Sequence, residues 1–350
     1  SDANCTALAQ FYWEIGDRNG EVLASGTRGL SPPSRNTSLR LYSAGKWLYS
    51  AYVLQKRGAA PLSLTDVQAL TMHSGYTDQG QCLGMTTVAA CQATLNGYDA
   101  SAVDTFSYGP GHFQKHAVAS MGLGTFSADQ LATEIVGTLG GGFVLSYAPP
   151  HLAGGARTTA ADYAVFLRRL LSGELMLGAL LGTHAVCADT GADCGALSSP
   201  ASDPLVGVQE PWHYSLGHWI EDAPGIGDGA FSSTGLGGFY PWIDADRQYY
   251  GIFVRDVATA SSSGDSVKCG RQIRKAWQDA LGPENGICGV AQGSTTSIYP
   301  ASELCAVGTE QPLDQTGTDG SYNWSCKGYR GGASVGCSAA STAPVNGVCG

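Results

Sequence analysis

The composition of the chain changes abruptly near Gly282, and this change limits what the 350 residues can fold into. Before it, apolar positions recur often enough for a sizeable core, and 43% of the whole chain is hydrophobic. From Pro283 onward the chain is rich in Gly, Ser and Thr, holds five of the eleven cysteines and has no long helical apolar pattern. We therefore expect two compact units, a large one over residues 1–284 and a small disulfide-rich β module over residues 285–350.

The eleven cysteines indicate disulfide bonds, because none stands in a Cys-x-x-Cys or Cys/His arrangement with the spacing of metal ligands. Disulfides persist in oxidising compartments, so we expect an exported bacterial protein, either secreted or periplasmic. The first residues show neither a methionine nor a charged-then-apolar leader, as expected of a mature exported chain. Two pairs that enclose short loops are expected to form local bridges: Cys82 with Cys91, and Cys187 with Cys194.

The two ends of the small module repeat each other, since Asn285-Gly-Ile-Cys-Gly289 and Asn346-Gly-Val-Cys-Gly350 differ at a single position. We interpret the module as one copy of a tandem repeat, cut off at the start of the next copy. Its internal cysteines then pair with one another, Cys349 belongs to the next copy, and Cys5 pairs with Cys269. The alternative is that Cys349 closes this module. The internal cysteines are Cys288, Cys305, Cys326 and Cys337.

Charged residues are sparse and mostly acidic: they make up 14% of the chain, and the net charge is −10. Such a surface repels nucleic acid and anionic lipid, so we expect neither as a partner. No uninterrupted apolar run reaches the roughly 18 residues that a membrane-spanning helix needs. The most apolar stretches, such as residues 143–147, have the length of a strand.

Several segments of the large unit predict regular elements. The Asn19-Gly20 pair is typical of a β-hairpin turn, because it accepts the positive φ angles of a type I′ turn. Thr159 is a candidate N-cap for a helix with apolar residues at helical spacing, which Gly173 would end. The predicted elements are hairpin strands at 9–17 and 21–26, late strands at 239–244 and 248–254, and a closing helix at 266–281.

The most informative short motif is Ser43-Ala-Gly-Lys46, which lies within the apolar and aromatic stretch of residues 41–54. A hydroxyl and an amine three residues apart on a helix share one face, so they can meet. Lysine acts as a base only when neutral, and burial can lower its pKa from about 10.4 toward about 7 to 8. The neighbouring Leu, Trp, Tyr and Val side chains are suited to supply that burial. The alternative is an ordinary exposed pair on a helix.

Five further segments follow this motif in order: Ala69-Leu-Thr-Met-His-Ser-Gly75, Phe106-Ser-Tyr-Gly-Pro-Gly-His-Phe-Gln114, residues 152–167, Tyr214-Ser-Leu-Gly217 and residues 232–244. Together they resemble the serine β-lactamase and penicillin-binding-protein superfamily, most closely its class C-like hydrolase and esterase branch, over roughly residues 6–284. The resemblance implies an α/β (α+β) fold, in which an antiparallel sheet is flanked by helices and joined to a mainly helical subdomain.

The resemblance also implies a role for each matching residue. Ser43 matches the acylated nucleophile, Lys46 its paired base, and Tyr108 the tyrosine that carries protons to the leaving group. The family's third motif, a Lys-Thr-Gly or His-Thr-Gly that lines the site, corresponds to Ser233-Thr234-Gly235. The oxyanion-hole N–H groups are implied to be those of Ser43 and Leu236. No metal and no organic cofactor is implied.

Two departures from the family pattern bear on the substrate. The family's Tyr-x-Asn is here Tyr108-Gly109-Pro110, so the asparagine that would hold a substrate amide is missing. His112 or Gln114 is a candidate replacement, and the alternative is that either is a surface residue. Ser233 replaces the cation that pairs with a substrate carboxylate in drug-hydrolysing members, and a neutral hydroxyl attracts a carboxylate far less strongly. Both departures favour an ester or an uncharged amide over penicillins.

We therefore interpret the chain as an exported serine hydrolase that forms an acyl-enzyme with a small-molecule or polymer-derived ester or uncharged amide. The alternatives are a peptidase or transpeptidase for D-residue or cell-wall peptides, an amidase for short oligoamides, and a non-hydrolytic penicillin-binding-like sensor. The small module is expected to tether the enzyme to a polymer or a cell surface. Its Tyr299, Tyr322 and Trp324 form either a binding face or the module's own core.

Three other features have simpler interpretations. Gly332-Ala-Ser-Val-Gly336 matches the Gly-x-Ser-x-Gly nucleophile elbow, but that motif needs a strand, a sharp turn and a helix, so we interpret this match as chance. His112 and His116 lie four residues apart without a third ligand in register, so no metal site is expected. His73 is expected to make a structural hydrogen bond.

Overall fold

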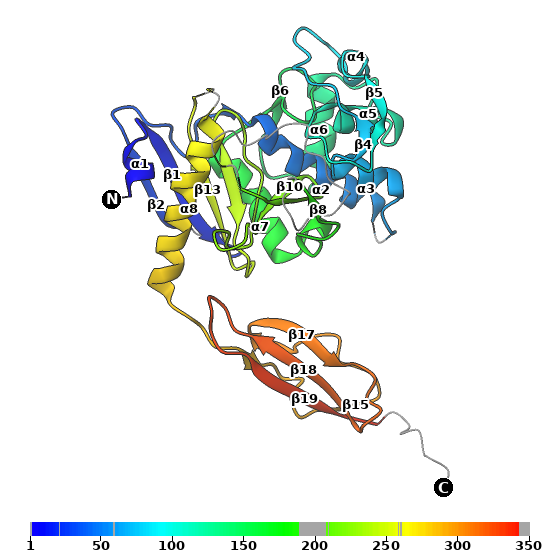
Figure 1. Cartoon of the computed structure of the whole chain (residues 1–350), viewed down its shortest axis with the longest axis vertical. Coiled ribbons are helices and arrows are strands. Elements are labelled where there is room, and N and C mark those ends of the chain that lie inside the picture. The colour runs from blue at the N-terminus through cyan, green and yellow to red at the C-terminus, as the bar shows by residue number, and fades with distance from the viewer. Residues whose placement is uncertain are drawn as a thin grey trace. The chain divides into compact units, whose positions relative to one another are not determined.

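Two compact units make up the chain, residues 1–273 and 274–350, and the division falls inside helix α8 (Ser262–Leu281). The computed structural model describes residues 2–20, 22–58, 60–188, 208, 210–257, 259 and 261–342 (Figure 1). Within these residues, no helix combines the length and the apolar character needed to cross a bilayer.

The first unit is built on an eight-stranded antiparallel sheet, in the order β2-β1-β13-β12-β11-β10-β9-β8. The predicted hairpin is confirmed as β1 paired with β2, and Gly20 in its turn has φ +102°. The two predicted late strands are confirmed as β12 and β13. The strands are β1 (Phe11–Asp17), β2 (Val22–Arg28), β8 (Val186–Cys187), β9 (His213–Ser215), β10 (His218–Glu221), β11 (Ala230–Ser232), β12 (Tyr240–Ile243) and β13 (Tyr249–Val254).

Two helices pack against the middle of this sheet. Helix α7 (Ala160–Ser172) contacts β13, and it has the predicted ends, since the Thr159 side chain accepts from the Asp162 N–H and Gly173 closes the helix at φ +78°. Helix α8 begins at Ser262, four residues before the predicted start, and lies in front of the sheet in Figure 1. At Gly270 it comes so close to β12 that a Cβ would lie 2.7 Å from the Tyr240 ring.

Most of the other helices form the mainly helical part of the unit, while α1 lies beside β1 (Figure 1). Figure 1 shows α3 to α6 gathered at the end of the unit away from β1 and β2. Two short sheets accompany them, β3-β7-β6 and β4-β5. The helices are α1 (Ala3–Thr6), α2 (Gly45–Arg57), α3 (Leu64–Leu70), α4 (Val88–Ala93), α5 (Gly111–Ala119) and α6 (Ala128–Thr138). The short strands are β3 (Leu39–Arg40), β4 (Ser74–Tyr76), β5 (Tyr98–Val103), β6 (Ser146–Tyr147) and β7 (Ala156–Thr158).

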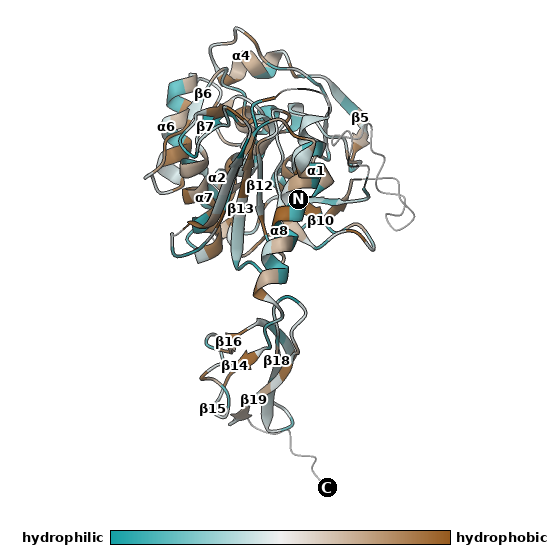
Figure 2. Cartoon of the chain, turned by 90° about the vertical axis from the view of Figure 1, so that its left-hand side faces the viewer, coloured by the Kyte–Doolittle hydropathy of each residue, from teal (hydrophilic) through white to brown (hydrophobic). Residues whose placement is uncertain are grey.

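Helix α2 is the centre of the first unit, because all residues from Gly45 to Leu54 are buried. A helix buried on every side belongs to the interior of a large core. Figure 2 shows hydrophobic residues running through the middle of the unit, where α2, α7 and the sheet meet. The turn before β10 packs directly on α2, since a Cβ on Gly217 would collide with the Ser50 hydroxyl. The side chain of Lys46 therefore begins inside the core.

The predicted disulfides of the first unit can be compared with the structure at three places. The bridges Cys5–Cys269 and Cys82–Cys91 are confirmed. The first of them attaches the N-terminal segment to α8. Cys187 is disulfide-bonded, and its predicted partner Cys194 lies outside the described residues.

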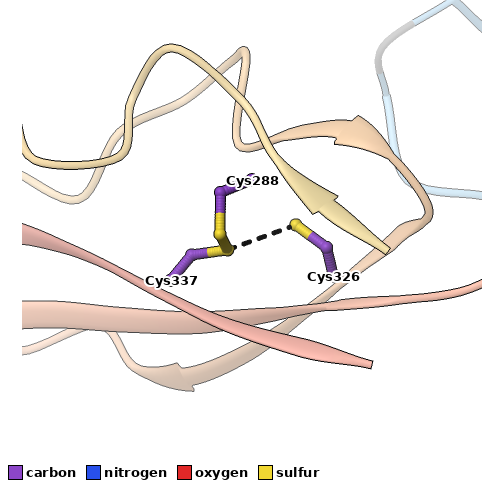
Figure 3. A group of neighbouring side chains, drawn as sticks. All are labelled: Cys288, Cys326 and Cys337. Atoms are coloured by element: carbon purple, nitrogen blue, oxygen red, sulfur yellow. Dashed lines mark hydrogen bonds between the residues drawn. A yellow bond between two sulfur atoms is a disulfide. The ribbon is translucent and has the colours of Figure 1, made fainter. Parts of the chain in front are cut away.

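The second unit contains a four-stranded sheet in the order β15-β19-β18-β17 and a β14-β16 pair. Its internal cysteines pair with one another as expected, as Cys288–Cys337 and Cys305–Cys326. Cys326 Sγ lies 3.6 Å from Cys337 Sγ, so the two bridges touch (Figure 3). Cys349 and the second Asn-Gly-Val-Cys-Gly stretch lie outside the described residues. The strands are β14 (Ile287–Cys288), β15 (Thr295–Thr296), β16 (Cys305–Val307), β17 (Thr309–Asp314), β18 (Ser321–Lys327) and β19 (Val335–Ser341).

The aromatic residues of the second unit form its core, which confirms one of the two alternatives predicted for them. Trp324 is fully buried and Tyr322 is 2% exposed. Their polar atoms are also satisfied internally, because the Trp324 indole donates to the Leu304 carbonyl at 2.8 Å and the Tyr322 hydroxyl to the Ser297 carbonyl at 2.9 Å. Tyr299 packs edge-on against both rings. A unit this small needs large side chains, together with disulfides, to fill its interior.

Candidate active site

Ser43 and Lys46 meet at the start of α2. Ser43 lies in a short 3₁₀ turn, Tyr42–Ala44, that runs directly into the helix. The Lys46 ammonium donates to the Ser43 hydroxyl, with Nζ 2.8 Å from Oγ. It also donates to the Ala153 carbonyl at 3.3 Å. The i, i+3 geometry expected from the sequence is therefore present, and the amine is held by a second contact from a distant part of the chain.

Burial lowers the pKa of Lys46 to about 7, because the ammonium loses most of its hydration there. The residue is 3% exposed, and Trp47, Leu48 and Tyr49 beside it are buried as well. A lysine with this pKa is partly neutral near pH 7, so it can accept a proton from the hydroxyl that it contacts. The alternative of an exposed pair on a helix is wrong.

Tyr108 completes a three-group arrangement. Lys46 Nζ lies 4.4 Å from the centroid of the Tyr108 ring. Burial raises the pKa of Tyr108 to about 12, and the polar side-chain groups of Ser43 and Trp219 limit the rise. The phenol is therefore neutral at ordinary pH. It can pass a proton by accepting one and giving one at the same time.

Trp219 is a site residue that the sequence did not reveal. Its ring stacks on Tyr108 with 5.3 Å between centroids, and its indole lowers the pKa of the Tyr108 hydroxyl. Tyr214, one strand away on β9, packs edge-on against both rings. These contacts fix the orientation of Tyr108. Trp219 stands two residues after the Tyr214-Ser-Leu-Gly217 motif, which is the signal that could have pointed to it.

The segment that follows β11 runs beside the turn that holds Ser43. Ser233 and Thr234 are each 3% exposed, and the Ser233 hydroxyl donates to the Ser43 backbone carbonyl at 3.2 Å. Gly235 lies against the backbone of Leu41, where a Cβ would collide with the Leu41 carbonyl oxygen. Leu236, the next residue, is 42% exposed. The third motif thus packs on the turn that holds Ser43, where Gly235 lies against the Leu41 backbone and the Ser233 hydroxyl bonds to the Ser43 carbonyl.

His112 and Gln114 are fully buried, so the alternative of surface residues is wrong for both. The His112 ring lies between two protein groups: Nε2 is 2.7 Å from the Ser107 carbonyl and Nδ1 is 2.7 Å from the Ser74 hydroxyl. The Gln114 amide donates to Val88 and Pro150 carbonyls and accepts from the Leu152 N–H. These bonds hold loops together. The geometry therefore gives both residues a structural role in place of the expected contact with a substrate amide.

The remaining predicted features lie apart from this site. His116 contacts the Tyr49 hydroxyl through Nδ1 and the Asp66 carboxylate through Nε2, both at 2.8 Å, which makes it part of a buried polar chain. His73 Nδ1 is 3.2 Å from the Thr71 hydroxyl, as expected of a structural hydrogen bond. Residues 332–336 run into strand β19, and no helix follows in the described residues up to 342, so we interpret the match to a nucleophile elbow as a coincidence.

Comparison with solved structures finds many similar folds, among them proteins described as a putative β-lactamase, a hydrolase and a penicillin-binding-protein homologue. A protein from Bacteroides dorei described as a putative β-lactamase has 22% sequence identity and a TM-score of 0.57, covering 76% of this chain and 92% of that one. EstCE1, described as a hydrolase with promiscuous acyltransferase activity, has 14% identity and a TM-score of 0.56, covering 77% and 93%. An octameric penicillin-binding-protein homologue from Pyrococcus abyssi has 11% identity and a TM-score of 0.53, covering 94% and 86%.

These likenesses show that the chain has the fold of the serine β-lactamases and penicillin-binding proteins, as the resemblance implied. No family model and no curated protein matches the chain.

Proposed function

We propose that this protein is a serine hydrolase that works through an acyl-enzyme on an ester or an uncharged amide. The observation that supports this most strongly is the pair at the start of α2, where Nζ of a buried lysine with a pKa of about 7 lies 2.8 Å from the Ser43 hydroxyl. Ser43 is the proposed nucleophile, Lys46 its base, and Tyr108 the proton carrier to the leaving group.

In the acylation step, Ser43 Oγ attacks the substrate carbonyl carbon while its proton moves to the neutral Lys46 amine. The carbonyl oxygen becomes an oxyanion, for which we propose the backbone N–H groups of Ser43 and Leu236 as donors. The bond to the leaving group then breaks. Tyr108 gives its proton to the departing oxygen or nitrogen and regains one from Lys46, so Lys46 and Tyr108 return to their starting protonation states while Ser43 carries the acyl group.

In the deacylation step, a water oxygen attacks the carbonyl carbon of the ester between substrate and Ser43. One water proton passes to Lys46, the bond from the carbonyl carbon to Ser43 Oγ breaks, and the proton returns to Oγ. The products are a carboxylic acid and the free serine, so water is consumed and no other reactant is needed.

The preference for an uncharged substrate follows from the third motif. Ser233 carries no charge, and its hydroxyl already donates to the Ser43 carbonyl. A substrate carboxylate at this position therefore meets no cation from residue 233. EstCE1, with a similar fold, is described as a hydrolase with promiscuous acyltransferase activity, which agrees with ester chemistry. A D-residue or cell-wall peptidase is the second candidate.

All of the proposed catalytic groups lie in the first unit. For the second unit we keep the proposal of a tether to a polymer or a cell surface. Its four paired cysteines suit an oxidising compartment, and we propose export to the cell exterior or periplasm on that ground.

Turnover of a short-chain nitrophenyl ester by the wild-type protein tests the proposal against the non-hydrolytic alternative. We expect steady release of nitrophenol over many equivalents of enzyme, because the same groups serve acylation and deacylation. The intact protein should be examined by mass spectrometry in the same samples. One equivalent of nitrophenol with a persistent adduct would instead identify a sensor.

A second test exchanges the group at position 233. Ser233→Lys places an ammonium beside the nucleophile, where a charge-assisted hydrogen bond contributes about 1.5 to 3 kcal/mol. The kcat/KM for carboxylate-bearing esters should therefore rise roughly tenfold to a hundredfold relative to neutral esters of the same size, and the gain should shrink with salt.

The ratio between the two substrates is the informative quantity, because the new cation also acts on Lys46 and the variant loses the hydrogen bond to the Ser43 carbonyl. Both effects apply equally to charged and neutral substrates. Ser233→Thr, which keeps the hydroxyl, is the matched control. An unchanged ratio in an active variant would show that residue 233 does not face the substrate.

A further inference from the structure

His151 is a buried imidazole without a hydrogen-bond partner. The residue is 5% exposed, and neither ring nitrogen has a partner among the described residues. Leaving buried polar atoms unpaired lowers stability, and an apolar side chain of similar size would avoid that loss. The stability of the fold therefore does not explain why this position holds an imidazole.

The backbone around His151 is held firmly by other groups. The Gln114 amide donates to the Pro150 carbonyl and accepts from the Leu152 N–H, both at 3.1 Å. The His151 carbonyl accepts from the Gly155 N–H at 2.8 Å. These bonds form a fixed turn over residues 149–155. The position of the ring is set by this turn and by packing, and not by hydrogen bonds of the ring itself.

This turn lies against the nucleophile and its base. The Ala153 carbonyl accepts from Lys46 Nζ at 3.3 Å. A Cβ on Gly154 would lie 3.1 Å from His151 Nδ1 and 4.0 Å from the Cα of Tyr42, the residue before Ser43. The ring is therefore close to the chain that holds Ser43, and the carbonyl two residues after it touches the catalytic amine.

The charges around the ring keep it neutral. Burial, together with the cations Lys46 and Arg40, lowers the pKa of His151 to about 3. The imidazole therefore does not compete with Lys46 for the proton of Ser43. A neutral imidazole offers one N–H donor and one nitrogen acceptor on different edges of the ring, so either nitrogen can hold a water molecule by one hydrogen bond.

We propose that His151 holds the water molecule that attacks the acyl-enzyme, beside Lys46. The inference rests on the proposed function and adds the group that orients the second reactant. In this step the water oxygen forms a bond to the acyl carbon, one water proton goes to Lys46 and then to Ser43 Oγ, and the bond from the acyl carbon to Oγ breaks. His151 neither gains nor loses a proton. Acylation by the substrate does not need this water, so His151 should matter only for deacylation.

The experiment separates the two steps with a nitrophenyl ester under pre-steady-state conditions. His151→Leu removes both ring nitrogens with little change in size, while His151→Asn and His151→Gln restore a donor and an acceptor at the level of Nδ1 or Nε2. In His151→Leu we expect an acylation rate within about twofold of wild type, a deacylation rate lower by roughly tenfold to a hundredfold, and acyl-enzyme that accumulates in intact-mass spectra. Either amide variant should recover part of the deacylation rate.

The melting temperature of His151→Leu distinguishes the proposed role from a structural one. If His151 served to hold the fold together, its replacement would lower the melting temperature. Because both nitrogens are unpaired, His151→Leu should melt at the same temperature as wild type or higher. His218 is the matched control, since it is equally buried and its ring contacts the Gly182 N–H and the Leu216 carbonyl. His218→Leu should melt at a lower temperature and leave the ratio of deacylation to acylation unchanged.

Two results would overturn the inference: an unchanged deacylation rate in His151→Leu, or equal losses in acylation and deacylation together with a lower melting temperature. In both of these the wild-type protein still forms an acyl-enzyme. If the wild-type protein itself forms none, the proposed function fails, and the inference about His151 fails with it for that separate reason.

Discussion

Replacing Ser43 with alanine should abolish ester hydrolysis, with kcat lower by about 10⁴-fold or more. The only group that we propose to bond with the substrate is Ser43 Oγ, which accepts a hydrogen bond from Lys46 Nζ at 2.8 Å. Removing it leaves Lys46 and Tyr108 without a nucleophile to activate. Steady-state kinetics with a neutral nitrophenyl ester, beside a circular dichroism spectrum, measures the effect.

The control for this substitution is Ser334→Ala. Ser334 lies at the centre of the Gly-x-Ser-x-Gly match, is exposed, and precedes a strand. Its replacement should leave kcat within about twofold of wild type. Full activity in Ser43→Ala, or loss of activity in Ser334→Ala, would place the nucleophile elsewhere.

Replacing Lys46 with methionine should lower kcat by about 10²- to 10⁴-fold, the usual contribution of a general base. In the wild-type protein, kcat/KM should rise with pH and level off above about pH 7, because the pKa of Lys46 is lowered to about 7 and the neutral amine is the active form. The pKa of Tyr108 is raised to about 12, so ionisation of Tyr108 should not lower kcat/KM anywhere below about pH 12. A pH–rate profile from pH 5 to pH 10 measures both features.

The same substitution should stabilise the fold. The pKa of Lys46 is about 7 in the folded state and 10.5 as the ordinary value, so the unfolded chain binds more protons between these two pH values. The buried ammonium therefore destabilises the protein most below pH 7, and this loss disappears above about pH 10.5. Lys46→Met should raise the melting temperature at pH 6 more than at pH 10.

Lys56→Met is the matched control on the same helix. Lys56 is half exposed and pairs with Glu134 at 2.7 Å, so its loss should change neither the pH–rate profile nor kcat by more than about twofold. A Lys46→Met variant with wild-type kcat would remove Lys46 from the mechanism. A wild-type profile that is flat across pH 7 would show that its amine is not the base.

The pairing of Ser43 with Lys46 could be predicted from the sequence because their contact is local. Residues three apart at the start of a helix meet whatever the rest of the chain does, and the apolar neighbours of Lys46 already indicate a buried amine. The cap at Thr159 and the Asn19-Gly20 hairpin are local features of the same kind. Tyr108 and the 233–235 segment are far away in sequence, and only the resemblance to a family connected them with Ser43.

Residues whose importance depends on tertiary contacts were missed or misplaced. Trp219 matters because β10 brings its indole to Tyr108, and its place two residues after the Tyr214-Ser-Leu-Gly217 motif does not by itself reveal that contact. His112 and Gln114 are polar residues that suggested either a surface or a substrate contact, yet both are buried and bond to loops. Trp324 suited either a binding face or the core of the small unit, and only the tertiary structure shows that it is core.

The most direct test of the account is to trap the acyl group and find the residue that bears it. The wild-type protein should be mixed with a slowly hydrolysed neutral ester, quenched in acid within the first turnover, digested and mapped by mass spectrometry. We predict one acyl group per protein, on the peptide that contains Ser43, which disappears as free acid is released. An acyl group on any other residue, or steady release of acid with no acyl-enzyme at any time, would contradict the account.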